Sequence, residues 1–254
     1  MPKAIHHVGF GRTAVDGVNS FFRPGKVIVG ISAVVTCLLV AYRFYLHEFA
    51  FGYGMDSFDP NFELYWMRLL WWQLLLFAVV TPASCLYLWL SREENVLNIS
   101  PREELYRYRL LFTYLLAMTP VFIFMVLATE SDAAWHQVAI RDSAFTPTHI
   151  GIFYFAMPLN FAFTVFGFVW VHLRLPDFHN RFSLPLLIVV LAPVLVLPNL
   201  GLNEWGHTFF YAEELFAAPI HWGFVLFSWG FYALAGFSIQ CFKRIRSLTR
   251  LENV

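Results

Sequence analysis

Residues 65–90 read YWMRLLWWQLLLFAVVTPASCLYLWL, and this stretch decides the fold class. Its only charged residue is Arg68. A helix needs about 20 mostly apolar residues to cross a bilayer core about 30 Å thick. The stretch is longer than that, so it predicts a membrane-spanning helix and an integral membrane protein.

Five further apolar runs lie before and after this stretch. They cover residues 27–46, 110–128, 149–173, 184–202 and 218–241. Together the six runs predict an all-α fold, a polytopic transmembrane helix bundle with about six spans. The fourth span is preceded by Thr146-Pro147, a hydroxyl cap and a proline at the first helical position. The fifth contains Pro185, Pro193 and Pro198, so we expect it to be kinked.

The beginning of the chain lacks a recognisable leader. Residues 1–25 have no apolar core of the kind that a cleavable signal peptide needs. We therefore expect the first span to be retained.

The composition of the chain agrees with a membrane protein. Of its 254 residues, 59% are hydrophobic and 13% are charged, whereas soluble domains carry about 25% charged residues. This excludes a disordered chain, a disulfide-stapled secreted module and an ordinary soluble enzyme. The formal net charge is +0, which argues against nucleic acid as a partner. Cys37, Cys85 and Cys241 are odd in number and lie in or beside apolar runs, so we interpret them as packing residues.

Charged residues predict the orientation of the bundle. Fourteen of the 17 Lys and Arg residues fall at the two termini and in the second and fourth loops, and ten of the 17 acidic residues fall on the opposite side. By the positive-inside rule the basic side, with both termini, is cytoplasmic. We therefore predict a cytoplasmic N-terminal segment (1–26), a transmembrane helical domain (27–241) and a cytoplasmic tail (242–254). The charged block at 100–109 is interpreted as a solvated helix start.

Polar residues at membrane depth are candidates for function because they are costly there. They form two sets on the outer side, in which an oxygen-bearing residue precedes a histidine by four positions and a second histidine follows 13 or 14 positions later. The first set is Asp132, His136 and His149, and the second is Asn203, His207 and His221. Residues four apart share a helix face, and the last histidine of each set comes from the start of the next helix. Each set therefore has the spacing of a metal site in a helix bundle.

Several chemistries fit these two sets. Imidazole and carboxylate ligands suit zinc, copper or non-haem iron, and copper has the highest intrinsic affinity for such donors. An amide oxygen is a weaker ligand, so we expect the Asn203 set to bind more loosely. The same residues also fit a proton relay in a transporter, or interfacial histidines hydrogen-bonded to backbone and water. Haem is disfavoured, because Glu213, Glu214 and Pro219 predict a loop between His207 and His221.

Longer motifs surround these sets. They are Gly54-Met-Asp-Ser-Phe58, Pro101-Arg-Glu-Glu104, Trp135-His-Gln137 with Arg141-Asp142, Phe145-Thr-Pro-Thr-His149, Arg174-Leu-Pro176, Leu197-Pro-Asn-Leu-Gly-Leu-Asn-Glu-Trp-Gly-His207 and Glu213-Glu-Leu-Phe-Ala-Ala-Pro219. From about residue 50 to residue 240 the chain resembles the C subunit of the copper membrane monooxygenases. This family comprises particulate methane monooxygenase, ammonia monooxygenase and their short-alkane relatives. The first 45 residues match no pattern that we know in it, and Ser131 stands where we expect Gln.

The resemblance implies a function that composition cannot show. In the family, one copper site has ligands that match Asp132, His136 and His149, and a second has ligands that match Asn203, His207 and His221. All six are thus candidate metal ligands and catalytic residues. Subunits A and B are the implied partners, in a trimer of heterotrimers in the inner or intracytoplasmic membrane of a bacterium. The complex would insert one atom of O2 into a C–H or N–H bond, with two electrons from a reductant.

The resemblance leaves the substrate and the role of the chain open. Methane, a short-chain alkane and ammonia all fit, and we expect an apolar, aromatic-walled pocket beside the metal to receive such a molecule. A transporter or relay, and a purely structural subunit with catalysis in a partner chain, are the alternatives.

Overall fold

The computed structural model describes residues 24–136, 145–192 and 213–252, and side chains in the last segment from residue 229. Its helices are α1 (Pro24–Phe49), α2 (Arg68–Leu90), α3 (Pro101–Ala117), α4 (Thr119–His136), α5 (Pro147–Gly151), α6 (Met157–Arg174), α7 (Pro176–His179) and α9 (Glu213–Glu252). Short π-helical turns, Glu63–Met67 and Ile152–Ala156, precede α2 and α6, and residues 184–192 are also helical. No strand occurs in these ranges, so the all-α class is confirmed.

Among the described residues, four helices are long and apolar enough to cross a membrane. They run over Pro24–Phe49, Glu63–Leu90, Pro101–Asp132 and Pro147–Arg174, and they contain the first four predicted spans. The fifth predicted span is helical over 184–192, and its remainder lies outside the described residues. Pro185 stands in the first turn of that segment, where proline is well tolerated, so it does not kink the helix. The sixth predicted span lies within α9, which extends well beyond it on both sides.

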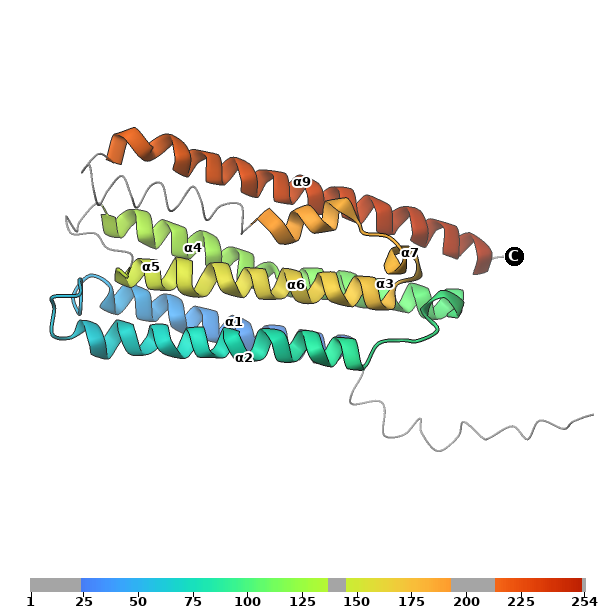
Figure 1. Cartoon of the computed structure of the whole chain (residues 1–254), viewed down its shortest axis with the longest axis horizontal. Helices are drawn as coiled ribbons and strands as arrows, with labels where there is room; N and C mark the ends of the chain where they lie inside the picture. Colours follow the sequence, from blue (N-terminus) through green and yellow to red (C-terminus); the bar gives the residue numbers. More distant parts are fainter. Residues whose placement is uncertain (1–23, 137–144, 193–212, 253–254) are drawn as a thin grey trace, which may run out of the picture.

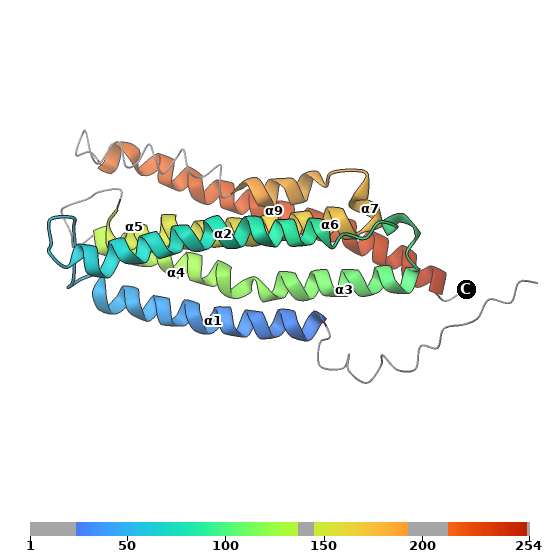
Figure 2. The same ribbon diagram turned by 60° about the horizontal axis from the view of Figure 1, so that its bottom comes forward.

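The helices pack side by side as an elongated bundle (Figures 1 and 2). At one end lie the α1–α2 connection, the last turn of α4 and the start of α5; we call this the outer end. At the other lie the α2–α3 connection, α7, the start of α1 and the end of α9 (Figure 1), which we call the inner end. The start of α1 and the end of α9 thus lie at the same end of the bundle (Figure 1).

Two buried apolar clusters hold the bundle together. The outer cluster includes Leu46, Trp66, Phe124, Trp135 and Ile150, all 2% exposed or less. The inner cluster includes Tyr108, Leu111, Val171, Phe178 and Phe237. Apolar side chains also cover the outside, among them Val34, Trp72 and Leu116, because lipid is as apolar as the core and demands no polar coat.

The prediction for the charged block 100–109 is partly wrong. Its helix start is confirmed, since α3 begins at Pro101 and the Ser100 hydroxyl accepts the N–H of Glu103. The solvated surface is confirmed for Arg102, Glu103 and Arg109, which are exposed, but not for Glu104, which is 2% exposed, or Arg107, which is 8% exposed. The sequence-based interpretation fails because the partners of these charges come from distant segments.

Both buried charges have partners at the inner end. The two carboxylate oxygens of Glu104 accept hydrogen bonds of 2.8 Å from Nε and Nη2 of Arg244 on α9. This bonding raises the pKa of Arg244 above its ordinary value. Arg107 donates to Glu103 at 2.9 Å and to Glu93 at 3.2 Å. The inner end is therefore held by a network of matched charges.

The start of α9 also differs from the prediction. The helix begins at Glu213, so the backbone at Glu213, Glu214 and Pro219 is helical and not a loop. The predicted cytoplasmic tail is helical as far as Glu252.

Candidate metal centre

The last turn of α4 carries Asp132 into the outer end of the bundle. Three residues further on, Trp135 is fully buried and its indole N–H donates to the backbone oxygen of Ala50 at 2.9 Å. Asp132 itself is 19% exposed at its side chain. The end of α4 is thus fixed against the loop that follows α1, next to the turn that carries Asp132.

His149 reaches the same place from the start of the next span. Thr146 caps α5 by accepting the backbone N–H of His149 at 3.2 Å, and Pro147 occupies the first turn, as predicted. The imidazole is 1% exposed, and its ring centroid lies 4.8 Å from that of Phe153. The π turn Ile152–Ala156 then shifts the helical register. The residues before this turn therefore face a different direction from the one they would face if α6 continued as a regular α-helix.

The two side chains meet across the α4–α5 contact. Nε2 of His149 lies 3.5 Å from Oδ1 of Asp132. A hydrogen bond between an imidazolium and a carboxylate measures about 2.7–2.9 Å, so this separation is long for one. Two donors that each lie about 2.0–2.2 Å from one tetrahedral metal ion are roughly 3.3–3.6 Å apart. The separation therefore fits two ligands of a single ion, and the donors suit copper, zinc or iron.

Arg43 on α1 is a neighbour of this site that the sequence analysis did not single out. Its guanidinium donates to the Ser131 hydroxyl and to Oε2 of Glu130, the latter at 2.7 Å. These are the two residues immediately before Asp132, so Arg43 ties α1 to the turn that carries the carboxylate. The only signal in the sequence was a basic residue close to the outer end of the first span.

Thr148 is a second residue that the sequence analysis passed over. It is 1% exposed, and its hydroxyl has no hydrogen-bond partner among the described residues. A buried polar group without a partner is rare in proteins, and this one belongs to the residue that precedes His149 in the sequence.

The structure describes the other four predicted ligands only in part. His136 ends α4, four residues after Asp132, and His221 lies on α9, but their side chains are outside the described residues. Asn203 and His207 lie outside them altogether. Within the described part of the chain, no group of three or more His, Cys, Asp or Glu side chains is placed so that it could hold a metal ion. The structure therefore brings together Asp132 and His149, and completion of either triad stays a prediction.

Fold and site together define a class: a helical membrane protein with a buried carboxylate–imidazole pair at one end of its bundle. The family model of the C subunit of ammonia monooxygenase/methane monooxygenase matches residues 12–252. The chain belongs to this family, which makes it a component of a membrane monooxygenase complex. A search among curated proteins found no match. The family resemblance is confirmed, but the expectation that the first 45 residues fall outside the family pattern is wrong, because the match begins at residue 12.

Proposed function

We propose that the chain is the C subunit of a copper-dependent monooxygenase that oxidises either a small apolar substrate or ammonia with O2 and a two-electron reductant. The substrate is methane, a short-chain alkane or ammonia. The observation that supports this most is the 3.5 Å approach of Asp132 and His149, two of the three residues of the first predicted copper site. His136 follows Asp132 by one helical turn and is the third ligand in this proposal.

The residues of the site would prepare it in three ways. The Asp132 carboxylate brings a negative charge that offsets part of the charge of a cation. The cap from Thr146 and the ring contact with Phe153 hold the His149 imidazole in one place. The buried side chains of the outer cluster, such as Trp135 and Ile150, limit the access of water. Bound copper would supply the activation of O2 and the transfer of an oxygen atom to the substrate.

The second site and the partners belong to the same proposal. Asn203, His207 and His221 would hold a second copper ion, more weakly because an amide replaces the carboxylate. Subunits A and B would cover part of the exposed apolar surface, in a trimer of heterotrimers in the bacterial cell membrane. Phe44 and Trp72, each 70% exposed, are examples of side chains that lipid or a partner protein would cover.

The test uses the intact complex, purified from native membranes into lipid nanodiscs. Copper, zinc and iron are measured by mass spectrometry, then removed with a chelator and restored one at a time. O2-dependent oxidation of methane, ethane, butane and ammonia is assayed at each stage. The proposal expects copper in the complex, loss of oxidation with its removal, and recovery with copper alone.

Different failures point to different alternatives. Absence of copper, or recovery with zinc or iron instead, would overturn the copper assignment. Proton uptake by the complex in sealed vesicles without any oxidation would indicate a relay. Full oxidation by an assembled complex with Asp132→Ala and no copper at this site would mean that this site is dispensable for the reaction.

A further inference from the structure

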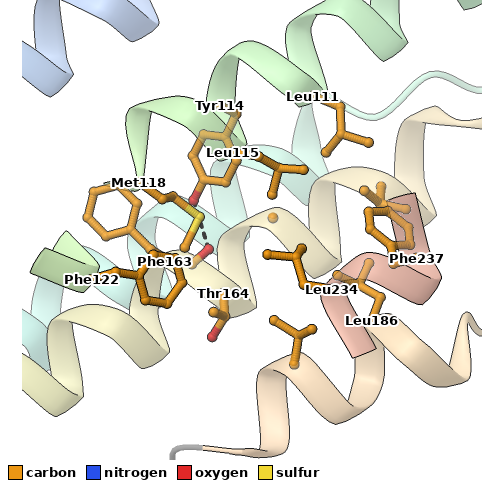
Figure 3. A pocket seen from close by; sticks show the side chains of 13 residues that line it. Leu111, Tyr114, Leu115, Met118, Phe122, Phe163, Thr164, Leu186, Leu234 and Phe237 are labelled. Carbon is orange, nitrogen blue, oxygen red and sulfur yellow. Dashed lines mark hydrogen bonds between the residues drawn. The ribbon is translucent and has the colours of Figure 1, made fainter. Parts of the chain in front are cut away.

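The inner half of the bundle contains an apolar, partly open cavity that is distinct from the candidate metal centre. It lies between α3, α4, α6, the 184–192 helix and α9 (Figure 3). Its walls include Leu115, Met118, Phe163, Leu186, Leu234 and Phe237. Phe122, also in the wall, stands ten residues before Asp132, which corresponds to about 15 Å along a helix. The cavity is therefore not the pocket that we expect directly beside the metal.

The cavity offers almost nothing to a polar molecule. The Tyr114 hydroxyl donates to the backbone oxygen of Phe163 at 2.7 Å, and the Thr164 hydroxyl donates to that of Phe161 at 2.9 Å. The two hydroxyl protons in the wall are thus already used. A water molecule in a cavity needs two to four polar partners, and cavities lined by apolar groups stay dry.

The size of the cavity limits its occupant. About 30 Å³ is open to the centre of a water-sized sphere, and one such sphere needs about 10–15 Å³. The space therefore suits about two or three non-hydrogen atoms. A sugar, a nucleotide or a quinone ring is far too large to be enclosed there.

Close packing between two residues of the cavity wall makes the remaining space notable. Gly167 lets the Tyr114 ring approach so closely that an added Cβ would lie 3.1 Å from Cε1 of that ring. A larger side chain at a wall position such as Val189 could have closed the space, because interiors normally pack at the density of organic crystals. Apolar side chains around an empty space forfeit dispersion contacts unless a molecule fills it.

We propose that this cavity binds a small non-polar gas, of the size of dioxygen or a one- to two-carbon alkane, on its way from the bilayer to the oxidation site. Such molecules dissolve in the lipid core, need no hydrogen bond, and regain the dispersion contacts that the empty space lacks. The role in supply rests on the proposed monooxygenase function. Binding itself does not, because it follows from the shape and chemistry of the walls.

The experiment uses xenon, a non-polar atom of similar size. The purified complex in nanodiscs is equilibrated under xenon pressure, and its structure is determined by cryo-electron microscopy or crystallography. Leu115→Phe fills the cavity from α3, and Leu116→Phe makes the same change at the next residue, which is 74% exposed and lies on the outside. Val189→Leu adds one methylene from the 184–192 helix and serves if Leu115→Phe prevents assembly.

The proposal expects xenon in the cavity of the wild type and of Leu116→Phe, and its loss from Leu115→Phe. In active complexes it also expects Leu115→Phe to raise the KM for the gaseous substrate severalfold with kcat unchanged. A lipid tail or ordered water filling the cavity, with no xenon, would overturn the proposal. Xenon binding in a complex that oxidises none of the substrates would support the cavity site and overturn the proposed function. Oxidation by a complex that binds no xenon would support the proposed function and overturn the cavity site.

Discussion

Helices α3 and α5 begin in the same way at opposite ends of the bundle. Ser100 and Thr146 are the caps, a proline follows each, and each side-chain oxygen accepts the N–H of the third residue at 3.2 Å. That third residue is Glu103 at the inner end and His149 at the outer end. An identical local construction thus presents two different side chains.

The difference shows which end serves structure and which is the candidate for chemistry. An acid in the first turn is favoured by the positive end of the helix dipole, and Glu103 also pairs with Arg107 one turn later. A histidine has no comparable reason to stand there. His149 is instead buried against Asp132, a residue of another helix, so its place is explained by the site and not by the helix start.

The largest expected effect comes from removing the imidazole at the outer end. His149→Ala should lower O2-dependent oxidation to background, because the first copper site loses a ligand. The matched control is His172→Ala, at the inner end of the same span, where the imidazole Nδ1 lies 2.8 Å from the backbone oxygen of Phe168. Initial rates on native membranes provide the measurement. Equal rates in both variants would mean that His149 has no specific role in the oxidation.

The next effect concerns stability at the inner end. Arg244→Met leaves Glu104 buried without its partner, which should destabilise the chain by about 3 kcal/mol, the low end for a broken buried pair because Arg244 is partly exposed. Adding Glu104→Gln removes the stranded charge and should restore most of this stability. Unfolding of the assembled complex in mixed detergent, with copper content as the second readout, tests this. A loss of copper from either variant that exceeds the loss of folded protein would contradict a purely structural inner end.

Arg43 should have a smaller and more specific effect. Arg43→Gln removes the hydrogen bonds to Glu130 and Ser131, which precede the proposed ligand Asp132. Hydrogen bonds made directly to a ligand change metal affinity by about 10- to 100-fold, so this less direct loss should lower copper affinity by less than about tenfold. Arg181→Gln is the control, because Arg181 forms an exposed ion pair with Asp177 at the inner end. Copper titration against a competing chelator measures both. Identical affinities would mean that Arg43 only holds α1 against α4.

The two caps give the smallest effects and compare the helix starts directly. Thr146→Ala and Ser100→Ala should each cost about 1 kcal/mol of stability. Only Thr146→Ala should also weaken copper binding, since its cap positions His149. The same unfolding and titration measurements apply, and weaker copper binding in Ser100→Ala would contradict the division between the two ends.

Local signals in the sequence were sufficient for most of the fold. Apolar runs of the length of a bilayer core indicated the four spans that the structure bears out, and Thr146-Pro147 indicated the start of the fourth. The spacing of Asp132 and His149 predicted a shared site, and the structure brings them together. These features depend on neighbours in sequence or on adjacent helix ends, which periodicity and caps can reveal.

Features that depend on distant segments could not be predicted. Nothing near Glu104 indicates that Arg244, 140 residues away, buries and neutralises it. Arg43 likewise acquires its role from Glu130 and Ser131 on another helix. The π turn Ile152–Ala156 and the apolar cavity arise from the packing of several helices, for which a single sequence has no local signature.

The most direct test of the copper assignment is the copper content and electron paramagnetic resonance of the purified complex. Wild type is compared with Asp132→Ala and His149→Ala, with His172→Ala as control. We predict that both outer-end variants lose the same copper ion and its nitrogen hyperfine signal, while the control retains them. Unchanged copper and an unchanged nitrogen signal in assembled Asp132→Ala and His149→Ala complexes would contradict the assignment.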